Sequence, residues 1–136
     1  MTRTYVLDAN AVLDLVEAGP GFHKVEQLLQ AASHNQHSVL ISVINWGEVF
    51  YLLWQRRGEE KARRTLAGLA RLPLQIVAVD LSQALQAEEI KVFHKLPYVD
   101  CIAAALTVSH QAILVSSDRD FEKLGRRVQI LWLPRP

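Results

Sequence analysis

The sequence has few of the features that mark several common classes of protein. It contains one cysteine, Cys101, so an internal disulfide framework is excluded and a reducing compartment is expected. No apolar run approaches the ~18 to 20 residues that a membrane-spanning helix needs. The N-terminal segment contains Asp8 and Asp14 and lacks a small-residue cleavage site, so it does not resemble a signal peptide. We therefore expect a cytoplasmic protein with no membrane partner.

Signatures of several catalytic and cofactor sites are also missing. The five histidines are scattered, and none has the HExxH-type spacing of a zinc enzyme. There is no GxSxG nucleophile elbow and no P-loop. Internal repeats, low-complexity segments and linkers are absent as well. A chain of 136 residues is then expected to form a single domain, residues 1–136, with a substantial core.

The charge balance gives no direct sign of nucleic-acid binding. Fifteen Lys and Arg residues against 14 Asp and Glu residues give a net charge of +1, whereas a basic footprint is expected of a nucleic-acid protein. If four acids were gathered in one pocket, 15 positive and 10 negative charges would remain, a net charge of +5. The densest basic segment, RRGEEKARR at residues 56–64, fits a solvated helix face with internal Glu–Arg pairs.

Apolar patterning predicts short strands that alternate with helices. Continuous apolar runs predict strands at residues 4–7, 39–42, 75–79, 112–117 and 128–133. Helical spacing and Gly or Pro stops predict helices at residues 11–18 and 22–32, around Glu48, between Gly58 and Pro73, and at 81–95, 98–110 and 118–125. This alternation predicts an α/β fold, a three-layer α/β/α arrangement with a five-stranded, mostly parallel sheet.

One carboxylate lies in an apolar segment where nothing local explains it. Glu48 is the only charged residue in VINWGEVFYLLW, residues 43–54, and no Lys or Arg lies three or four residues away on its helix face. A buried, unpaired carboxylate is costly unless it finds a partner or stays protonated. Its partner must therefore come from outside this segment.

Three further acids lie where predicted strands end or helices begin. Asp8 follows the first strand, Asp118 follows the fourth, and Asp100 lies in the first turn of the helix after Pro97. Ligand sites of parallel α/β sheets lie at the carboxyl ends of strands, and the helix after a strand starts at that same edge. Asp8, Glu48 and Asp118 are therefore expected to converge, and the position of Asp100 is compatible with this but not forced.

Each of these three acids also has a simpler explanation. Asp8 would close an Asx turn, Asp118 would cap a helix, and Asp100 would favour the positive end of its helix dipole. Glu48 has no comparable local explanation, so the four together favour a common cause. A hard divalent cation is that cause, because Mg²⁺ prefers oxygen ligands and leaves positions for phosphate oxygens. Such an ion activates water and stabilises the charge that develops on a phosphodiester.

Four segments, in order, resemble the PIN-domain family, and in particular the VapC-type toxins of prokaryotic toxin–antitoxin pairs. They are YVLDANAVL, SVINWGEV, YVDCIAAAL and VSSDRDF, and the resemblance covers nearly the whole chain. It implies that Asp8, Glu48, Asp100 and Asp118 form a catalytic acidic quartet that binds Mg²⁺ or Mn²⁺. It also implies an accessory role for Asp120.

The same resemblance implies that Asn10, Ser42 and Ser116 line the site. The sequence departs from many relatives at Ala9, where they place Ser or Thr, and this removes a possible hydroxyl contact with substrate. The family further implies cleavage of single-stranded RNA, a homodimer, and a cognate antitoxin whose tail occludes the site.

Two other classes of function remain open from the sequence. A receiver-like signalling domain would also have five strands, and Asp80 follows the third of them, but the paired acids after the first strand and the Lys after the fifth are missing. A PIN-like scaffold that acts only by binding is the second alternative. Metal-dependent RNA cleavage would separate the enzyme from the scaffold. We expect Cys101 to be a packed small hydrophobic residue, and the three tryptophans to lie in the core or a dimer interface.

Overall fold

Five short strands form one parallel sheet in the computed structural model, which describes residues 2–136. The strands are β1 (Thr4–Leu7), β2 (Ser38–Ser42), β3 (Gln75–Val77), β4 (Ile113–Ser116) and β5 (Gln129–Trp132). Their order across the sheet is β3-β2-β1-β4-β5, and every neighbouring pair is parallel. The predicted sheet is therefore confirmed, with all rather than most of its pairs parallel. The edge strand β3 is shorter than predicted and ends at Val77.

This strand order excludes the receiver-like alternative. Receiver domains have the order 2-1-3-4-5, whereas this chain places β1 at the centre between β2 and β4. The direction of strand addition reverses between β1 and β4, which is the place where open α/β sheets bind ligands. The sheet therefore points to the carboxyl ends of β1 and β4 as the site.

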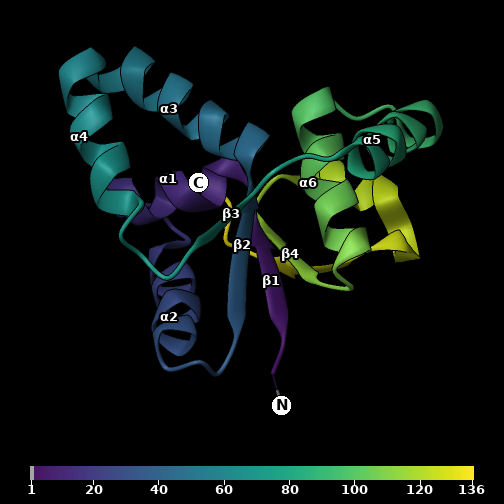
Figure 1. Ribbon diagram of the computed structural model, residues 1–136, viewed down its shortest axis with the longest axis horizontal. Helices are drawn as coiled ribbons and strands as arrows, with labels where there is room; N and C mark the ends of the chain where they lie inside the picture. Colours follow the sequence, from purple (N-terminus) through teal and green to yellow (C-terminus); the bar gives the residue numbers. More distant parts are fainter. Residues whose placement is uncertain (1) are drawn as a thin grey trace.

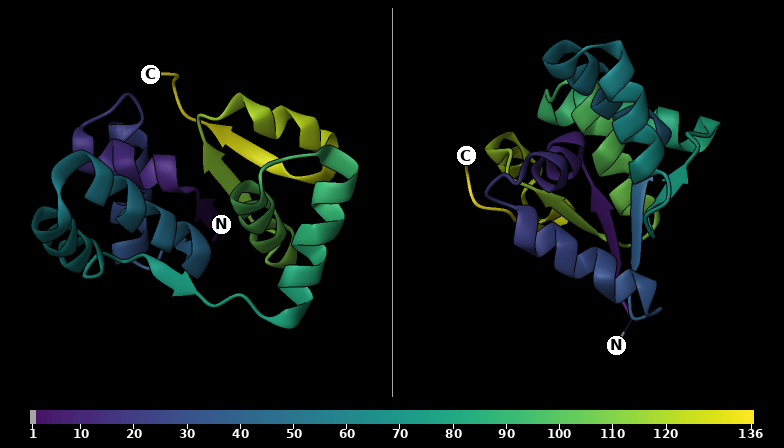
Figure 2. Two further views of the ribbon diagram at one scale, coloured as in Figure 1. Left: turned by 90° about the horizontal axis from the view of Figure 1, so that it is seen from above. Right: turned by 90° about the vertical axis from the view of Figure 1, so that its left-hand side faces the viewer.

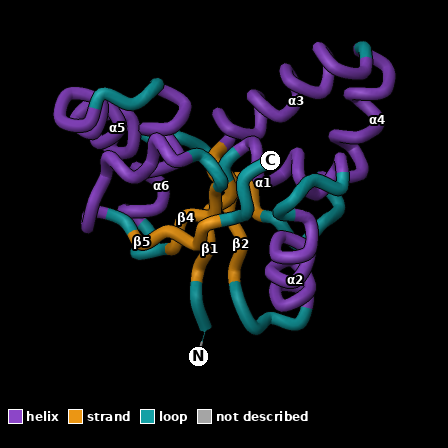
Figure 3. The backbone as a smooth tube through the Cα atoms, turned by 180° about the vertical axis from the view of Figure 1, so that it is seen from behind, coloured by secondary structure: helices purple, strands orange, loops and turns teal. Residues whose placement is uncertain are grey.

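Helices cover both faces of the sheet, as predicted. They are α1 (Ala9–Glu17), α2 (Phe22–Ser33), α3 (Val43–Arg57), α4 (Glu59–Leu69), α5 (Leu81–His94), α6 (Tyr98–Ser109) and the 3₁₀ helix η1 (Arg119–Arg127). Figure 1 shows α1 to α4 on one side of the sheet and α5 and α6 on the other. The views in Figure 2 and the view from behind in Figure 3 show the same two groups of helices.

Two apolar cores follow from the alternation of side chains along the strands. In β1, Leu7 packs into the core under α1 to α4, whereas Val6 packs into the core under α5 and α6. In β4, Val115 likewise packs into the core under α1 to α4, and Leu114 into the core under α5 and α6. Asp8 keeps an extended backbone, with φ −86° and ψ 176°, so its side chain continues the alternation onto the α6 face. Ser116 follows Leu114 onto that face too.

The first helix ends where predicted, at a turn in which Gly19 and Gly21 lie close to the side chain of Asp14. Asp14 in α1 accepts a hydrogen bond from the backbone N–H of Gly21 at 3.0 Å. A Cβ atom at Gly19 would lie 2.2 Å from Asp14 Oδ1, and one at Gly21 would lie 2.4 Å from Asp14 Oδ2. A side chain at either position would push the Asp14 carboxylate aside, which at Gly21 would disturb its hydrogen bond to the backbone.

The basic segment at residues 56–64 behaves as predicted. Arg63 pairs with Glu59 at 2.9 Å and Arg64 with Glu60 at 3.8 Å, both along exposed faces of α4. Exposed pairs of this kind contribute at most about 1 kcal/mol each, so they indicate a solvated surface rather than a stability device. Across residues 2–136, no helix combines the length and apolar character needed to cross a membrane.

Candidate active site

Asp8 lies at the end of the central strand and is almost completely buried, with 5% of its surface exposed. Its Oδ1 accepts a hydrogen bond from the backbone N–H of Ala11 at 2.8 Å, so Asp8 caps α1. Its Oδ2 accepts a hydrogen bond from the hydroxyl of Ser116 at 2.5 Å. Asp8 therefore has a local structural role, as the cap of α1 rather than in the predicted Asx turn, and this role coexists with a position inside the candidate site.

Ser116 joins Asp8 to Asp118. While its hydroxyl donates to Asp8, the same oxygen accepts a hydrogen bond from the backbone N–H of Asp118 at 2.9 Å. Ser116 is fully buried at the carboxyl end of β4, next to β1. Asp118 also caps η1, because its Oδ1 accepts from the backbone N–H of Asp120 at 2.9 Å. One buried hydroxyl thus sets the relative positions of the acids that follow β1 and β4.

Glu48 reaches the same edge of the sheet from α3. Ser42, the last residue of β2, caps this helix by accepting a hydrogen bond from the backbone N–H of Ile44 at 3.2 Å. The helix consequently begins at the carboxyl end of β2 and carries the half-buried Glu48 on its second turn. Figure 1 shows α3 rising from this end of the sheet.

Asp100 comes from the opposite face. It lies in the first turn of α6, a helix that packs on β1, β2 and β4 and also contacts α3. The charges of Asp118, Asp8, Glu48 and Asp120 all act on Asp100, and those of Asp118 and Glu48 act on Asp8. The structure therefore brings together all four acids of the predicted quartet, including Asp100, whose place the sequence left open.

Burial makes three of these carboxyl groups, Asp8, Glu48 and Asp100, harder to ionise, and neighbouring negative charges add to the effect for Asp8 and Asp100. Burial, reinforced by the negative charges of Asp118 and Glu48, raises the pKa of Asp8 to about 6, against the opposing hydrogen bonds from Ser116 and Ala11. Burial also raises the pKa of Asp100 to about 7, with further contributions from the neighbouring acids. For Glu48, burial raises the pKa, and interaction with the Asn45 side chain opposes the increase.

The predicted accessory residues divide into two groups. Ser42 and Ser116 are fully buried at strand ends and hold the backbone and side chains of the site. Asn10 and Asp120 are exposed. Asn10 lines a cleft of about 340 Å³ beside α1, together with Ser117 and Arg56, and within residues 2–136 its side chain makes no hydrogen bond to the acids.

Sequence reasoning missed two features of this edge. Asn45, three residues before Glu48, is buried and donates a hydrogen bond from Nδ2 to the backbone carbonyl of Val99 at 3.1 Å. Arg119 stacks over the ring of Trp132 at 4.3 Å and donates a hydrogen bond to the carbonyl of Leu133 at 3.4 Å. A polar Asn beside Glu48 in an apolar segment was a usable signal, whereas the stacking of Arg119 on a residue 13 positions away in the sequence had none.

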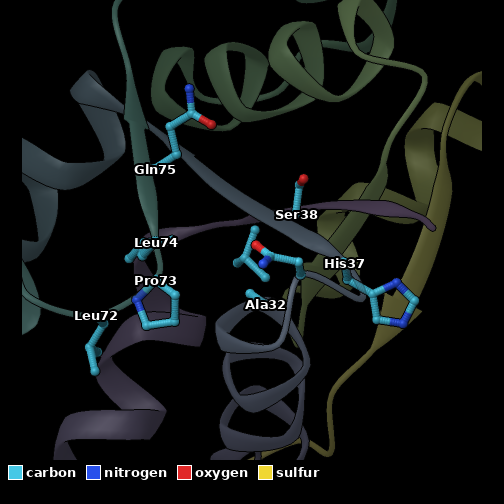
Figure 4. Close-up of a pocket in the computed structure, with 9 residues that line it drawn as sticks. Ala32, His37, Ser38, Leu72, Pro73, Leu74 and Gln75 are labelled. Carbon is cyan, nitrogen blue, oxygen red and sulfur yellow. The ribbon is translucent and has the colours of Figure 1, made fainter.

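Cys101 and the opposite end of the sheet offer no competing site. The Cys101 thiol is buried in the core and unbonded to other cysteines, as predicted, and burial raises its pKa, which makes it a poor nucleophile. A hollow at the amino ends of β2 and β3 is lined by Ala32, His37, Ser38, Leu72, Pro73, Leu74 and Gln75 (Figure 4). No carboxylate lines it, so it does not share the character of the acidic cluster at the carboxyl ends of the strands.

The donor set of the acidic cluster suits a hydrated divalent cation. Its candidate ligands are all carboxylate oxygens, and burial together with neighbouring negative charges raises the pKa of Asp8 and Asp100, which a bound cation would counteract. Within residues 2–136, no three His, Cys, Asp or Glu side chains are arranged to hold an ion directly. Mg²⁺ usually keeps several waters and binds through one or two carboxylates, so the wider spacing fits a hydrated ion rather than a dry cage.

Comparison with known proteins identifies the fold. The sequence model of the PIN domain matches residues 5–127, most of the chain. The chain belongs to the PIN-domain family. VapC-type PIN domains are in general nucleases. No curated protein sequence matches the chain.

Solved structures share the fold of this PIN domain along almost its whole length. One is VapBC2 from Rickettsia felis bound to a promoter DNA fragment, with TM-score 0.79 and 16% identity, covering 96% of this chain and 99% of that one. Another is DNA-bound VapBC from Salmonella typhimurium, with TM-score 0.78 and 19% identity, covering 95% and 97%. A third is VapC20 from Mycobacterium tuberculosis, with TM-score 0.71 and 23% identity, covering 89% and 95%. These similarities establish the VapC-type fold.

The raised pKa values predict how pH affects the metal-free protein. A carboxyl group whose pKa is higher in the folded state costs nothing below its unfolded pKa, destabilises the fold increasingly as pH rises towards the folded pKa, and adds no further cost above it. Asp100→Asn cannot ionise, so in EDTA its melting temperature should increasingly exceed that of the parent from about pH 4 to about pH 7 and then differ by a constant amount. Asp80→Asn is the matched control, because it removes a helix-capping carboxylate whose charge does not act on Asp8 or Asp100. If the difference in melting temperature between Asp100→Asn and the parent did not change with pH, the raised pKa of Asp100 would be contradicted.

Proposed function

We propose that this PIN domain is a divalent-metal-dependent endoribonuclease that cleaves single-stranded RNA, and that it is the toxin of a type II toxin–antitoxin pair. The observation that carries the proposal is the convergence of Asp8, Glu48, Asp100 and Asp118 at one edge of the sheet. They come from four separate segments and from both helix layers. Burying several carboxylates together opposes folding, so the arrangement makes sense if a cation and a phosphodiester occupy it.

The named relatives support the toxin assignment. The structures from Rickettsia felis and Salmonella typhimurium are VapBC complexes, and the VapC20 structure is described as a toxin that cleaves the sarcin–ricin loop. A cognate antitoxin and an RNA substrate are therefore the natural proposals for this chain. The same proposal places the protein in the cytoplasm, where its single thiol, Cys101, would stay reduced.

Asp8, Glu48, Asp100 and Asp118 would hold Mg²⁺ or Mn²⁺. When bound, such an ion lowers the pKa of coordinated water and neutralises charge on the phosphodiester. The raised pKa values mean that Asp8 and Asp100 must lose protons before they serve as ligands, so ion binding should strengthen as pH rises through about 6 to 7. The Ser116 hydroxyl donates a hydrogen bond to Asp8 and so fixes the orientation of this carboxylate.

The rim of the site offers contacts for a polyanion. Arg119 is held by the Trp132 ring and the Leu133 carbonyl, and these contacts leave other N–H groups of its guanidinium for a phosphate. Trp132 lies in β5 opposite Ser116 of β4, so this cation is one strand away from the acids. Asn10 and Ser117 line the neighbouring cleft and would position the substrate on the other side.

Two apolar surfaces suit the proposed protein partners. On α5, Leu81, Leu85 and Val92 share one face and are 76%, 62% and 72% exposed, which suits the proposed homodimer. Between α3 and α4, Trp46, Phe50 and Leu66 line an apolar groove, which suits a segment of the antitoxin. We propose these as the two interaction surfaces.

Metal-dependent cleavage tests the enzymatic proposal against a purely binding scaffold. The purified protein should cleave mixed single-stranded RNA with Mg²⁺ or Mn²⁺ and lose that activity in EDTA. Asp8→Asn should lower the rate by orders of magnitude while circular dichroism shows an intact fold, because it removes the charge at the centre of the cluster. Full activity in EDTA would overturn the metal requirement. No cleavage by the parent under any condition would favour the scaffold.

Asp118 and Asp120 should differ in their importance. Asp118 is tied to Ser116 and is the strongest of the neighbouring charges acting on Asp100, whereas Asp120 is exposed and acts on Asp100 most weakly. Asp118→Asn should nearly abolish RNA cleavage, and Asp120→Asn should retain measurable activity. Rates measured at saturating Mg²⁺ would decide, and equal losses would show that the fourth acid is wrongly assigned.

A further inference from the structure

A single buried side chain connects the two helices that carry Glu48 and Asp100. Asn45 lies in the first turn of α3, one helical turn before Glu48, and is 1% exposed. Its Nδ2 donates to the backbone carbonyl of Val99 at 3.1 Å, and Val99 immediately precedes Asp100 in α6. The Asn45 amide also interacts with the Glu48 carboxylate. Asn45 therefore joins the helix that carries Glu48 to the backbone beside Asp100.

This connection crosses between the two helix layers. α3 packs with the helices on one face of the sheet and α6 on the other, and they meet only beyond the carboxyl ends of the strands. The separation of Glu48 and Asp100 consequently depends on how the first turns of α3 and α6 are held together. A change in the bond between Asn45 and Val99 would move one acid relative to the other.

The oxygen of Asn45 has no partner. Oδ1 is buried and accepts no hydrogen bond from any group in residues 2–136. A buried unpaired group of this kind opposes folding, and native proteins contain few of them. A leucine of similar size would fill the space without that cost. The Val99 carbonyl would not need Asn45 either, since a carbonyl inside a helix already accepts from the amide four residues on.

No group in residues 2–136 supplies the missing donor. The acids near Asn45 are the proposed ligands of the cation, and a carboxylate that binds a cation has lost its proton and only accepts hydrogen bonds. A water molecule bound to a cation is a strong donor and would lie among these acids. Groups that hydrogen-bond to the surroundings of a metal in this way orient its ligands, and their removal typically costs about 10- to 100-fold in metal affinity.

We propose that Asn45 is a positioning residue of the metal site: its nitrogen fixes Glu48 and Asp100 relative to each other, and its oxygen accepts a hydrogen bond from water held by the divalent cation. This inference rests on the proposed metal-dependent function. It assigns no contact between Asn45 and the reacting phosphodiester. Asn45 acts through the acids that it holds.

Calorimetric titration of the EDTA-stripped protein with Mn²⁺ tests this role without measuring activity. Asn45→Leu should bind Mn²⁺ about 10- to 100-fold more weakly than the parent, while its metal-free melting temperature stays equal or rises because the unpaired oxygen is gone. Asn45→Ser keeps one hydroxyl and should fall between the two. It also serves as the test variant if Asn45→Leu does not fold.

Thr107→Val is the matched control. Thr107 is buried in α6 and its hydroxyl donates to the Ala103 carbonyl at 2.8 Å, within the helix, so the variant removes a buried polar group without affecting the contact between α3 and α6. It should keep the parent's affinity for Mn²⁺. Parent-like affinity in both Asn45 variants, or an equal loss in Thr107→Val, would overturn the role of Asn45. If the parent itself binds neither Mn²⁺ nor Mg²⁺, the proposed metal-dependent function fails together with it.

Discussion

The burial of several carboxyl groups together at one edge of the sheet is the constraint on which the rest of this structure depends. Asp8 and Asp100 have raised pKa values because water is largely excluded and like charges lie nearby. The fold nevertheless keeps them in place with the Ser116 hydroxyl, the first turn of α1 and the contact between α3 and α6. A stable sheet below the site, with two apolar cores, is what allows this unfavourable arrangement to persist.

Residues of the candidate site have roles in the fold as well as in the proposed chemistry. Asp8 caps α1, Asp118 caps η1 and Ser42 caps α3, so each is a normal helix-capping residue. The structural and the functional explanations of these residues are therefore not alternatives. Parallel α/β sheets favour such dual roles, because the end of a strand and the beginning of a helix meet at the edge where ligands bind.

Much of the fold and most of the site followed from the sequence, since they depend on local patterns. Continuous apolar runs predicted every strand, and the position of Asp8 and Asp118 directly after strands placed them at the carboxyl edge. Glu48 could be located because Ser42 starts its helix at that same edge. Asp100 was different: it follows a helix rather than a strand, so only the packing of α6 against the sheet and α3 places it.

The remaining features depend on contacts between distant segments. The hydrogen bond between Asn45 and Val99 joins residues 54 positions apart, and no periodicity encodes it. β3 is shorter than its apolar run because an edge strand pairs on one side only, and its pairing with β2 ends at Ser42, where α3 begins. The sequence also did not predict the exposed apolar face of α5, because Leu81, Leu85 and Val92 are residue types typical of a core.

The central claim is that Glu48 is kept for cation binding at a cost to the empty fold. Melting curves of the parent and Glu48→Gln, each in EDTA and in excess Mg²⁺, test it most directly. Burial raises the pKa of Glu48, so at neutral pH its charge opposes folding, and Glu48→Gln should melt higher than the parent in EDTA. In Mg²⁺ at ~100 times its Kd, the parent should gain about 2.7 kcal/mol and the variant much less. If Glu48→Gln is instead less stable in EDTA and gains as much from Mg²⁺ as the parent, Glu48 is a structural residue and the account is wrong.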